Sequence, residues 1–414
     1  MKILLITAVF YPEVSSSAQI YYDLAMGFVK KGHSVDILTS YPRTYNCSYS
    51  DTQQEIPIYE EHEGLRIHRV KHFSKRDSKI LRGLEHFYLP LYYFKQYTRI
   101  QKISKSKFDV CIIYIAPLPL YYLGRAIKYY DGTLTIFNIE EFHPQELTDV
   151  GFVRNPVVIT ILKYIEHRLY QNADYLTVHS PGGVQYLVER GAIMERITVT
   201  FNSLDLRIVD DPLIIGNFKE KHNISNKFLV SYGGVFSPFQ GLDDILDVAK
   251  LLLYESEIIF YIAGDGMMRD HLKTRIEREQ ISNVCLCPYL PRIEYLNLVK
   301  SSDITLVSLD RRMKSPVLPG KLATLMGMKK LIIANVDPDS ETAQIINISQ
   351  CGSVVTPGHT EEFAGTILKY KLNSTLAYQH GLLGRKYMEK NMSSDIVIDA
   401  YLNIIEGFKE KMSR

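Results

Sequence analysis

The chain has 414 residues, of which 46% are hydrophobic and 23% are charged, a composition typical of globular proteins with two or three domains. Its formal net charge of +2 argues against general nucleic-acid binding, which needs a strong basic excess. Five scattered cysteines suit a reducing compartment, and no apolar run approaches the roughly 18 residues of a membrane-spanning helix. We therefore expect a cytoplasmic protein.

The first half of the chain alternates short apolar runs with helical patterns. Residues 2–9 predict a buried strand rather than a signal peptide, because Tyr-Pro-Glu follows where a small-residue cleavage site would stand. A helix ending at Gly32 and a strand at 34–39 come next. The alternation continues with strands near 109–115, 133–139, 174–178 and 197–200 and helices near 118–130, 155–171 and 182–190. This pattern predicts a parallel sheet with helices on both faces.

Residues 71–107 interrupt the alternation and concentrate positive charge. They contain ten Lys or Arg residues, only two acidic residues, Asp77 and Glu85, and seven interleaved aromatic residues. A basic, aromatic and partly amphipathic segment suits the anionic inner face of a membrane. The alternative is a solvated helix face over the sheet. We favour the membrane because the remainder of the chain carries a net negative charge.

The second half begins after an irregular polar linker at 201–226. Strands at 228–232, 258–263 and 284–287 are each followed by a helix, and residues 359–414 are helical throughout. Residues 303–347 predict a strand, a basic loop with Arg311, a helix opened by Pro319-Gly320-Lys321, a second strand and a helix capped by Ser340. Free N–H groups at a helix start, with the Lys321 charge, favour an anion, so we expect a diphosphate site. The alternative is an ordinary connection with solvated basic side chains.

Five stretches in order resemble glycosyltransferase family 4, the retaining sugar-nucleotide transferases of the GT-B fold. They are FYPEVSSSAQIYYDLAMGFVKKGHSVDILT, VSYGGVFSPFQGLDDILDVAKLL, FYIAGDGMMRDHL, NVCLCPYLPRIEYLNLVKSSDITLVSL and LPGKLATLMGMKKLIIANVDPDSETAQII. The chain is most similar to the bacterial subgroup that includes the N-acetyl-fucosamine transferases of O-antigen and capsule synthesis. That subgroup has Pro-Ser-Lys at the position of Pro319-Gly320-Lys321.

The resemblance implies an α/β protein with two Rossmann-like, doubly wound domains facing across a cleft. The domains would be 1–205, which binds the acceptor, and 206–392, which binds the donor, with a C-terminal helix at about 393–414 packing on the first. The donor would be a nucleotide-diphosphate sugar, UDP-linked, and no metal or other cofactor is required. The residues expected at the donor are Ser16, Ser17, Gly233, Gly234, Gly264, Leu290, Arg311, Gly320, Lys321 and Glu341.

Glu140 and Glu141, in the stretch FNIEEFHPQE, occupy the positions where the family contacts the sugar or the acceptor, with His143 nearby. A carboxylate at a strand end can position a hydroxyl or accept its proton, and two close carboxylates raise one another's pKa. We expect both to be catalytic, and the alternative is a solvated acidic loop.

The chain also departs from the family pattern. Ser15-Ser16-Ser17 stands where a Gly-Gly pair is usual, and the basic pair after the Gly233-Gly234 strand is absent. The two positions of the usual Glu-x7-Glu pair hold Pro316 and Thr324, so the ribose-binding carboxylate is missing. Glu341 is the nearest substitute, although it would equally complement a helix dipole.

The resemblance implies transfer of a hexose or N-acetylated deoxysugar from a UDP-sugar to a lipid-linked glycan precursor of capsule or O-antigen. The enzyme would be peripheral to the inner face of the cell membrane. Two alternatives remain open: a non-catalytic GT-B binding subunit, which the missing Glu pair favours, and a UDP-sugar epimerase on the same fold.

Overall fold

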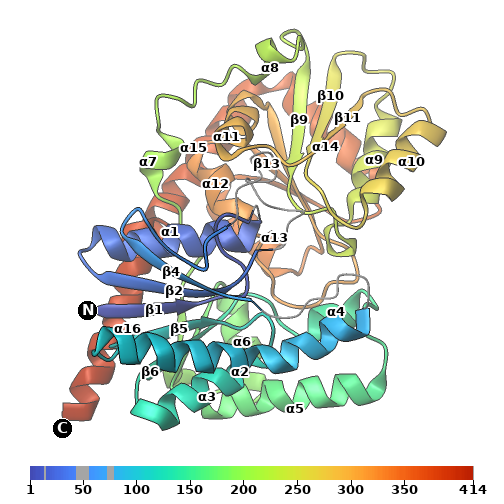
Figure 1. Cartoon of the computed structure of the whole chain (residues 1–414). Coiled ribbons are helices and arrows are strands. Elements are labelled where there is room, and N and C mark those ends of the chain that lie inside the picture. The colour runs from blue at the N-terminus through green and yellow to red at the C-terminus, as the bar shows by residue number, and fades with distance from the viewer. Residues whose placement is uncertain (14, 43–55, 72–78, 414) are drawn as a thin grey trace. The chain divides into compact units, whose positions relative to one another are not determined.

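The computed structural model describes residues 1–13, 15–42, 56–71 and 79–413 (Figure 1). The chain forms two compact units, and each is described by itself. Unit 1 consists of Met1–Ser203 and Ser394–Arg414, and unit 2 consists of Leu204–Ser393. The corresponding limits expected from the sequence are 1–205 and 206–392.

Unit 1 is built on an eight-stranded sheet in the order β3-β4-β2-β1-β5-β6-β7-β8. Every pair of neighbours is parallel except β3 and β4. The strands are β1 (Lys2–Ile6), β2 (Ser34–Ser40), β3 (Tyr59–His62), β4 (Leu65–Val70), β5 (Val110–Tyr114), β6 (Leu134–Ile139), β7 (Tyr175–Val178) and β8 (Ile197–Val199). The sequence pattern did not predict β3 and β4, because their charged residues break the apolar runs that indicate buried strands.

The helices of unit 1 lie on opposite faces of this sheet. They are α1 (Ser16–Lys30), α2 (Lys79–Ser104), α3 (Leu120–Asp131), α4 (Gln145–Asp149), α5 (Pro156–Asn172), α6 (Pro181–Glu189) and α16 (Ser394–Ser413). The chain crosses from β1 to β2 in one direction and from β4 through β8 in the other. Right-handed connections therefore place α1 on one face and α2, α3, α5 and α6 on the other, as Figure 1 shows.

The C-terminal helix α16 returns to unit 1 and packs on α1. A Cβ on Gly27 of α1 would stand 2.7 Å from Ile398 Cγ1, so only glycine permits this close approach. The buried Tyr401 hydroxyl lies 3.2 Å from both Asn138 Nδ2 and Thr177 Oγ1. These contacts confirm the predicted helix that crosses back to the N-terminal domain.

Unit 2 contains a six-stranded, fully parallel sheet in the order β11-β10-β9-β12-β13-β14. Its strands are β9 (Phe228–Gly233), β10 (Ile258–Ala263), β11 (Val284–Cys287), β12 (Ile304–Ser308), β13 (Ile332–Asn335) and β14 (Gly352–Val355). Its helices are α7 (Leu206–Val209), α8 (Phe218–Lys221), α9 (Leu242–Leu251), α10 (Arg269–Arg278), α11 (Arg292–Ser301), α12 (Lys321–Gly327), α13 (Glu341–Ser349), α14 (Thr360–Leu372) and α15 (Ser374–Asn391). The predicted α/β class with two doubly wound parallel sheets is confirmed.

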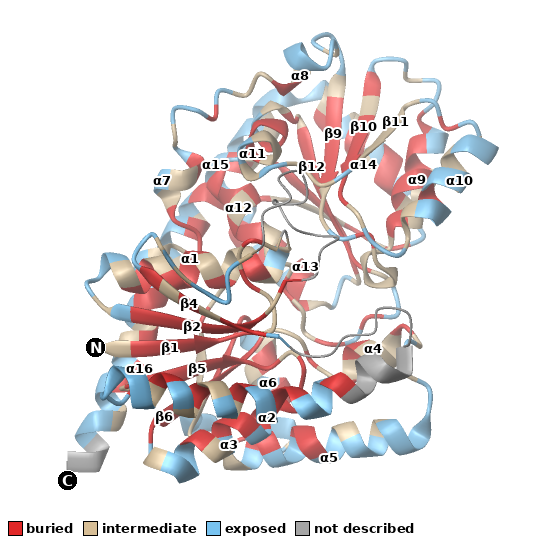
Figure 2. Cartoon of the chain, in the orientation of Figure 1, coloured by how far each residue is buried: buried red, intermediate tan, exposed pale blue. Residues whose placement is uncertain are grey.

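The central strands of both sheets are buried (Figure 2). Residues 201–226, predicted as an irregular linker, contain the short helices α7 and α8. The predicted basic segment 71–107 contains α2, while residues 72–78, with Lys75 and Arg76, lie outside the described residues.

Candidate functional site

The predicted nucleotide residues of unit 2 gather where the direction of the sheet reverses. From β9 the chain adds β10 and β11 on one side, and then β12, β13 and β14 on the other. In parallel α/β sheets, ligands bind at the carboxyl ends of the strands beside such a reversal. Gly233 and Gly234 end β9 at this point, and the loop after the neighbouring β12 leads to Gly320 and Lys321.

The loops after β9 and β10 touch through their glycines. A Cβ on Gly264 would stand 1.9 Å from the Gly234 carbonyl oxygen, and both residues have positive φ angles, 155° and 156°. The N–H of Phe236 donates to the Asp265 carbonyl oxygen at 2.7 Å, which ties the two loops together. Side chains are therefore excluded here, and backbone groups at the ends of two adjacent strands remain open to close approach.

Lys321 extends from the start of α12 to these glycines. Its Nζ lies 3.8 Å from the centre of the Tyr232 ring, and a Cβ on Gly234 would stand 2.9 Å from it. The residue as a whole is partly exposed, but Nζ is buried and has no hydrogen-bond partner among the described residues. Burial lowers the pKa of this amine to about 7. A buried amine without an acceptor is unfavourable, and an anionic oxygen would satisfy it.

The other basic side chains of the loop after β12 differ in their partners. Arg312 Nε donates to Asp310 Oδ1 at 2.7 Å, and Lys314 Nζ donates to Asp337 Oδ2 at 2.8 Å. Arg311 is exposed. Carboxylates thus already neutralise two of the three basic side chains of this loop, and Lys321 is the better placed cation.

Two further predicted residues follow other strands at the same edge of the sheet. Leu290 lies after β11 and packs, partly buried, against a small apolar cluster with Leu298. Glu341 is buried in the first turn of α13, after β13, where Ser340 caps the helix by accepting the N–H of Ala343 at 3.2 Å. The expected cap is present, and an acidic residue at this position complements the helix dipole.

In unit 1, Ser17 and Glu141 meet through a residue that the sequence analysis missed. The Tyr114 hydroxyl, at the end of β5, donates to Glu141 Oε1 at 2.9 Å and lies 3.4 Å from Ser17 Oγ. His143 Nε2 stands 3.3 Å from the other Glu141 oxygen. Ser16 is exposed in the first turn of α1, and Ser15 caps that helix. A tyrosine ending the buried strand VCIIY is the signal that could have identified Tyr114.

These side chains also flank a reversal of strand order. In unit 1 the reversal falls between β1, which leads to Ser17, and β5, which ends at Tyr114. Glu140 and Glu141 follow the adjacent strand β6. The arrangement therefore places two carboxylates and a tyrosine hydroxyl at the edge where such sheets bind ligands.

The two carboxylates differ in their environments. Burial of the Glu140 carboxyl, together with the nearby charge of Glu141, raises its pKa to about 8. The Asn202 amide nitrogen, turned toward it, lies 2.8 Å from Oε1 and 3.0 Å from Oε2. The Glu141 side chain is half-exposed. At neutral pH Glu140 therefore retains a proton, although both residues remain partly exposed to solvent.

This difference predicts a pH-dependent stability. Glu140 has a folded-state pKa near 8, whereas its ordinary value is 4.5, so unfolding between these pH values releases a proton and becomes easier. Glu140→Gln should therefore gain stability over the parent as pH rises from 4.5 to 8, by about 1.4 kcal/mol per pKa unit at most. Thermal unfolding across this range tests it, and a constant difference in Tm would contradict it.

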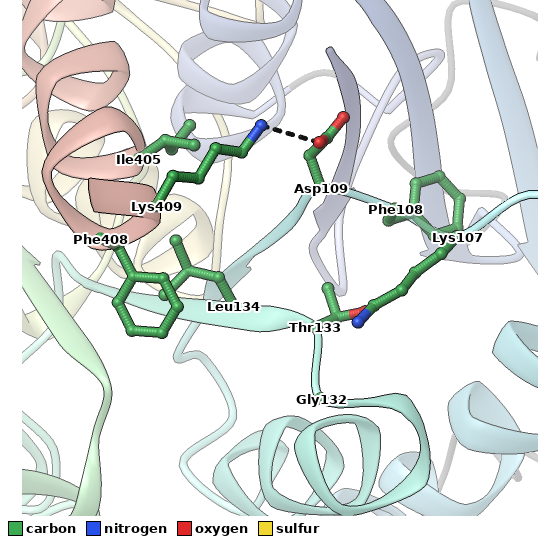
Figure 3. Close-up of a pocket in the computed structure, with 9 residues that line it drawn as sticks. All are labelled: Lys107, Phe108, Asp109, Gly132, Thr133, Leu134, Ile405, Phe408 and Lys409. Carbon is green, nitrogen blue, oxygen red and sulfur yellow. Dashed lines mark hydrogen bonds and ion pairs between the residues drawn. The ribbon is translucent and has the colours of Figure 1, made fainter. Parts of the chain in front are cut away.

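A cavity of about 400 Å³ lies at the opposite, amino ends of β5 and β6 (Figure 3). Lys409 Nζ donates to Asp109 Oδ1 at 2.8 Å, and Lys107 Nζ donates to the Asp131 carbonyl oxygen at 2.5 Å. None of the predicted site residues lines this cavity. Its cations are already bonded, so it is not the site that the sequence indicated.

In the described ranges, no group of three or more His, Cys, Asp or Glu residues is arranged to hold a metal ion. No helix in the same ranges is both long and apolar enough to cross a membrane.

Known proteins resemble this chain in one domain and in the fold. Residues 215–381 match the family described as "Glycosyl transferases group 1". No curated protein gives a significant match. Sucrose-phosphate synthase from Thermosynechococcus elongatus superposes with a TM-score of 0.77 at 14% identity, covering 100% of this chain and 99% of that one.

Two further solved structures are similar over the whole chain. HepE from Anabaena, solved in complex with UDP, has a TM-score of 0.69 at 13% identity, with 100% of both chains covered. WaaG, described as a glycosyltransferase involved in lipopolysaccharide biosynthesis, has a TM-score of 0.69 at 13% identity, covering 98% of this chain and 100% of that one. The fold is therefore GT-B, as predicted, and the match of residues 215–381 to the glycosyl transferases group 1 family supports glycosyltransferase activity.

Proposed function

We propose that the chain is a retaining glycosyltransferase of family 4, in the subgroup that resembles the N-acetyl-fucosamine transferases. It transfers a hexosyl or N-acetylhexosaminyl group from a UDP-sugar to a lipid-linked glycan precursor in cell-surface polysaccharide synthesis, such as that of capsule or O-antigen. One observation carries the proposal: the Lys321 amine beside Gly234 is buried and has no hydrogen-bond partner in the part of the chain that the structure describes.

The donor diphosphate occupies the loops after β9 and β10 in this proposal. Its oxygens accept hydrogen bonds from N–H groups of the glycine loops and from the Lys321 ammonium. This satisfies an amine that has no acceptor among the residues the structure describes. Positive charge fixed at this position stabilises the diphosphate as it leaves with the sugar–oxygen bond electrons. UDP as the nucleotide is supported by the neighbours solved with UDP or a UDP-sugar, HepE and TarM among them.

The acceptor hydroxyl is positioned by the carboxylates of unit 1. Glu141 is half-exposed and is held by Tyr114 and His143, so its orientation is fixed before the acceptor arrives. Glu140 remains protonated at neutral pH and can donate a hydrogen bond from the same edge of the sheet. Glu141 can accept a hydrogen bond from the acceptor hydroxyl, and Glu140 can donate one to it. Two such bonds at adjacent positions fix the orientation of the hydroxyl.

The lipid-linked acceptor places the enzyme at the cytoplasmic face of an anionic membrane, reached through residues 71–107. In the described part of this segment, Lys95, Arg99 and Lys102 are exposed on α2. Basic side chains near an anionic surface each contribute about 1 kcal/mol to binding.

A donor panel tests the proposal. The protein is incubated with UDP- and GDP-sugars, and nucleotide release and thermal shift are recorded. We expect one UDP-sugar to raise the Tm by several degrees and to release UDP slowly, since a ligand at 100 times its Kd adds about 2.7 kcal/mol of stability. A thermal shift without any UDP release, even with acceptor-bearing membranes, would instead identify a binding subunit. Interconversion of the sugar without release would identify an epimerase.

A further inference from the structure

Three neighbouring helices of unit 1, α2, α3 and α5, expose apolar and aromatic side chains to solvent. They cover the same face of the sheet, opposite α1 (Figures 1 and 2). We call their outward surface the three-helix face. Only α2 belongs to the segment 71–107 that the sequence singled out.

The outward side of α2 changes character along its length. Tyr88, Leu91 and Tyr92 are exposed in its first half, Leu91 by 68%, while Lys95 and Arg99 are exposed in its second half. These residues recur at helical spacing and so share one side of the helix. The inward side carries Tyr93 and Tyr97, which are fully buried.

α5 carries an apolar stripe that none of the described elements of unit 1 covers. Val157, Ile161 and Tyr164 are spaced by four and three residues, and they are exposed by 65%, 45% and 60%. Such spacing puts them on one side of the helix. Lys163 and Arg168 are exposed beside them.

α3 joins these two helices into one surface. Phe94 of α2 contacts Tyr130 of α3 edge to face, with ring centres 5.8 Å apart. Burial raises the pKa of the Tyr121 hydroxyl on α3, and the nearby charges of Arg125 and of Arg168 on α5 partly oppose this rise, so Arg168 lies close to α3. Tyr129, on the outward side of α3, is 95% exposed.

The exposed charge of the three-helix face has a single sign. In α2 from Glu85 onward, and throughout α3 and α5, every exposed charged side chain is basic. Glu85 and Glu166 are buried, and Asp131 accepts hydrogen bonds from Tyr97 and Gln101. A second copy of the same face would be repelled, whereas an anionic surface would be attracted.

We propose that the three-helix face is the membrane-docking surface, with the α5 stripe inserted at the boundary of headgroups and acyl chains. The proposal rests on the membrane role proposed for residues 71–107 and extends it to α3 and α5. Exposed tyrosines suit this boundary because the ring is apolar and the hydroxyl is wet. The basic residues of α2 attract the anionic lipid, and the aliphatic residues of α5 supply apolar burial.

Vesicle binding separates the two contributions. The apolar variant is Val157→Ser/Ile161→Ser/Tyr164→Ser, and the basic variant is Lys95→Gln/Arg99→Gln/Lys102→Gln. The control variant, Ile348→Ser/Leu372→Ser/Tyr254→Ser, changes three exposed residues of unit 2. For vesicles of phosphatidylcholine with phosphatidylglycerol, we expect the apolar variant to bind with about tenfold or more weaker affinity than the parent. The basic variant should lose about five-fold in vesicle affinity for each side chain replaced, or roughly 100-fold in all. The control should bind like the parent.

A tryptophan probe reports insertion directly, because the chain contains no tryptophan. Tyr164→Trp should shift its emission to shorter wavelength on the anionic vesicles and be quenched by brominated lipid. Tyr254→Trp, on an exposed position of unit 2, should show neither effect. Equal quenching at both positions would overturn the proposal.

The outcomes also distinguish this inference from the proposed function. Calorimetric UDP binding should be unchanged in the apolar and basic variants, since none of the substituted residues belongs to unit 2. If the apolar variant keeps full vesicle binding while the basic variant loses it, α2 alone docks on the membrane. The proposal that the whole three-helix face docks is then wrong. If both keep full binding, the membrane role itself fails, while the donor chemistry is judged separately by UDP binding and turnover.

Discussion

Lys321→Ala should weaken UDP binding about 10- to 150-fold, the value of one charge-assisted hydrogen bond of roughly 1.5–3 kcal/mol. The reason is the position of Nζ, which is buried, unpartnered among the described residues and directed at the Gly234 backbone. Binding of UMP should weaken less, because it lacks the second phosphate. Isothermal titration calorimetry with UDP and UMP on parent and variant measures both effects.

Two further variants sharpen this test. Lys321→Arg should recover only part of the affinity, because a planar guanidinium does not occupy the space of an ammonium point charge. Lys314→Ala removes the same charge from the preceding loop, where the amine is bonded to Asp337, and should bind UDP like the parent. UDP binding that is undiminished in Lys321→Ala would move the phosphate site to Arg311 and Arg312, or remove it.

The same lysine makes UDP binding dependent on pH. Burial lowers its pKa to about 7 in the free protein, and a bound diphosphate would favour the charged form. Above pH 7 the amine must take up a proton on binding, so affinity should fall by up to tenfold per pH unit. Lys321→Ala should lose this dependence. If UDP affinity falls equally with pH in the parent and in Lys321→Ala, the pH dependence comes from another group.

Glu141→Gln should lower turnover by about 10²- to 10⁴-fold, the usual contribution of a positioned acid or base. UDP affinity should change far less, because a group that acts on the acceptor is felt mainly in the transition state. Turnover is measured as release of UDP from the donor sugar in the presence of acceptor-bearing membranes. Glu140→Gln, Glu140→Ala and Glu141→Ala should also lose turnover. Tyr114→Phe should lose part of it, because it removes the hydrogen bond that holds Glu141.

A nearby carboxylate provides the matched control. Glu146 is buried, has a pKa raised to about 8 by burial and accepts the N–H of Phe142 at 2.5 Å. Glu146→Gln keeps an acceptor at that position and should retain turnover. Normal turnover in both single variants and in Glu140→Gln/Glu141→Gln would show that the loop is only acidic surface.

The sequence by itself determined the class of fold. Short apolar runs alternating with helical stretches permit few arrangements other than parallel sheets covered by helices, since a strand apolar on both sides must be buried on both. The strands β3 and β4 were not predicted from the sequence, because polar partners that are distant in the chain satisfy their charged side chains. For example, Arg66 Nε donates to Asp36 Oδ1 at 3.1 Å. That pairing is invisible until both strands are placed.

The candidate site was predictable only in part. Glycines and a lysine after strands indicate an anion site, because few other residues allow close backbone approach and supply charge. The sequence cannot show that Lys321 lies against Gly234 and Tyr232 while Arg312 and Lys314 lie against carboxylates, since these pairings join separate loops.

Tertiary structure alone decided the partners of Glu140 and Glu141 and the exposure of α5. Tyr114 and Asn202 are distant from the carboxylates in sequence and reach them only because strands β5 and β6 are neighbours and the chain returns after β8. The sequence predicted a helix near 155–171 and did not show which of its apolar side chains stay exposed. Helical periodicity shows which side chains share a side, but only the packed fold shows whether another element covers that side.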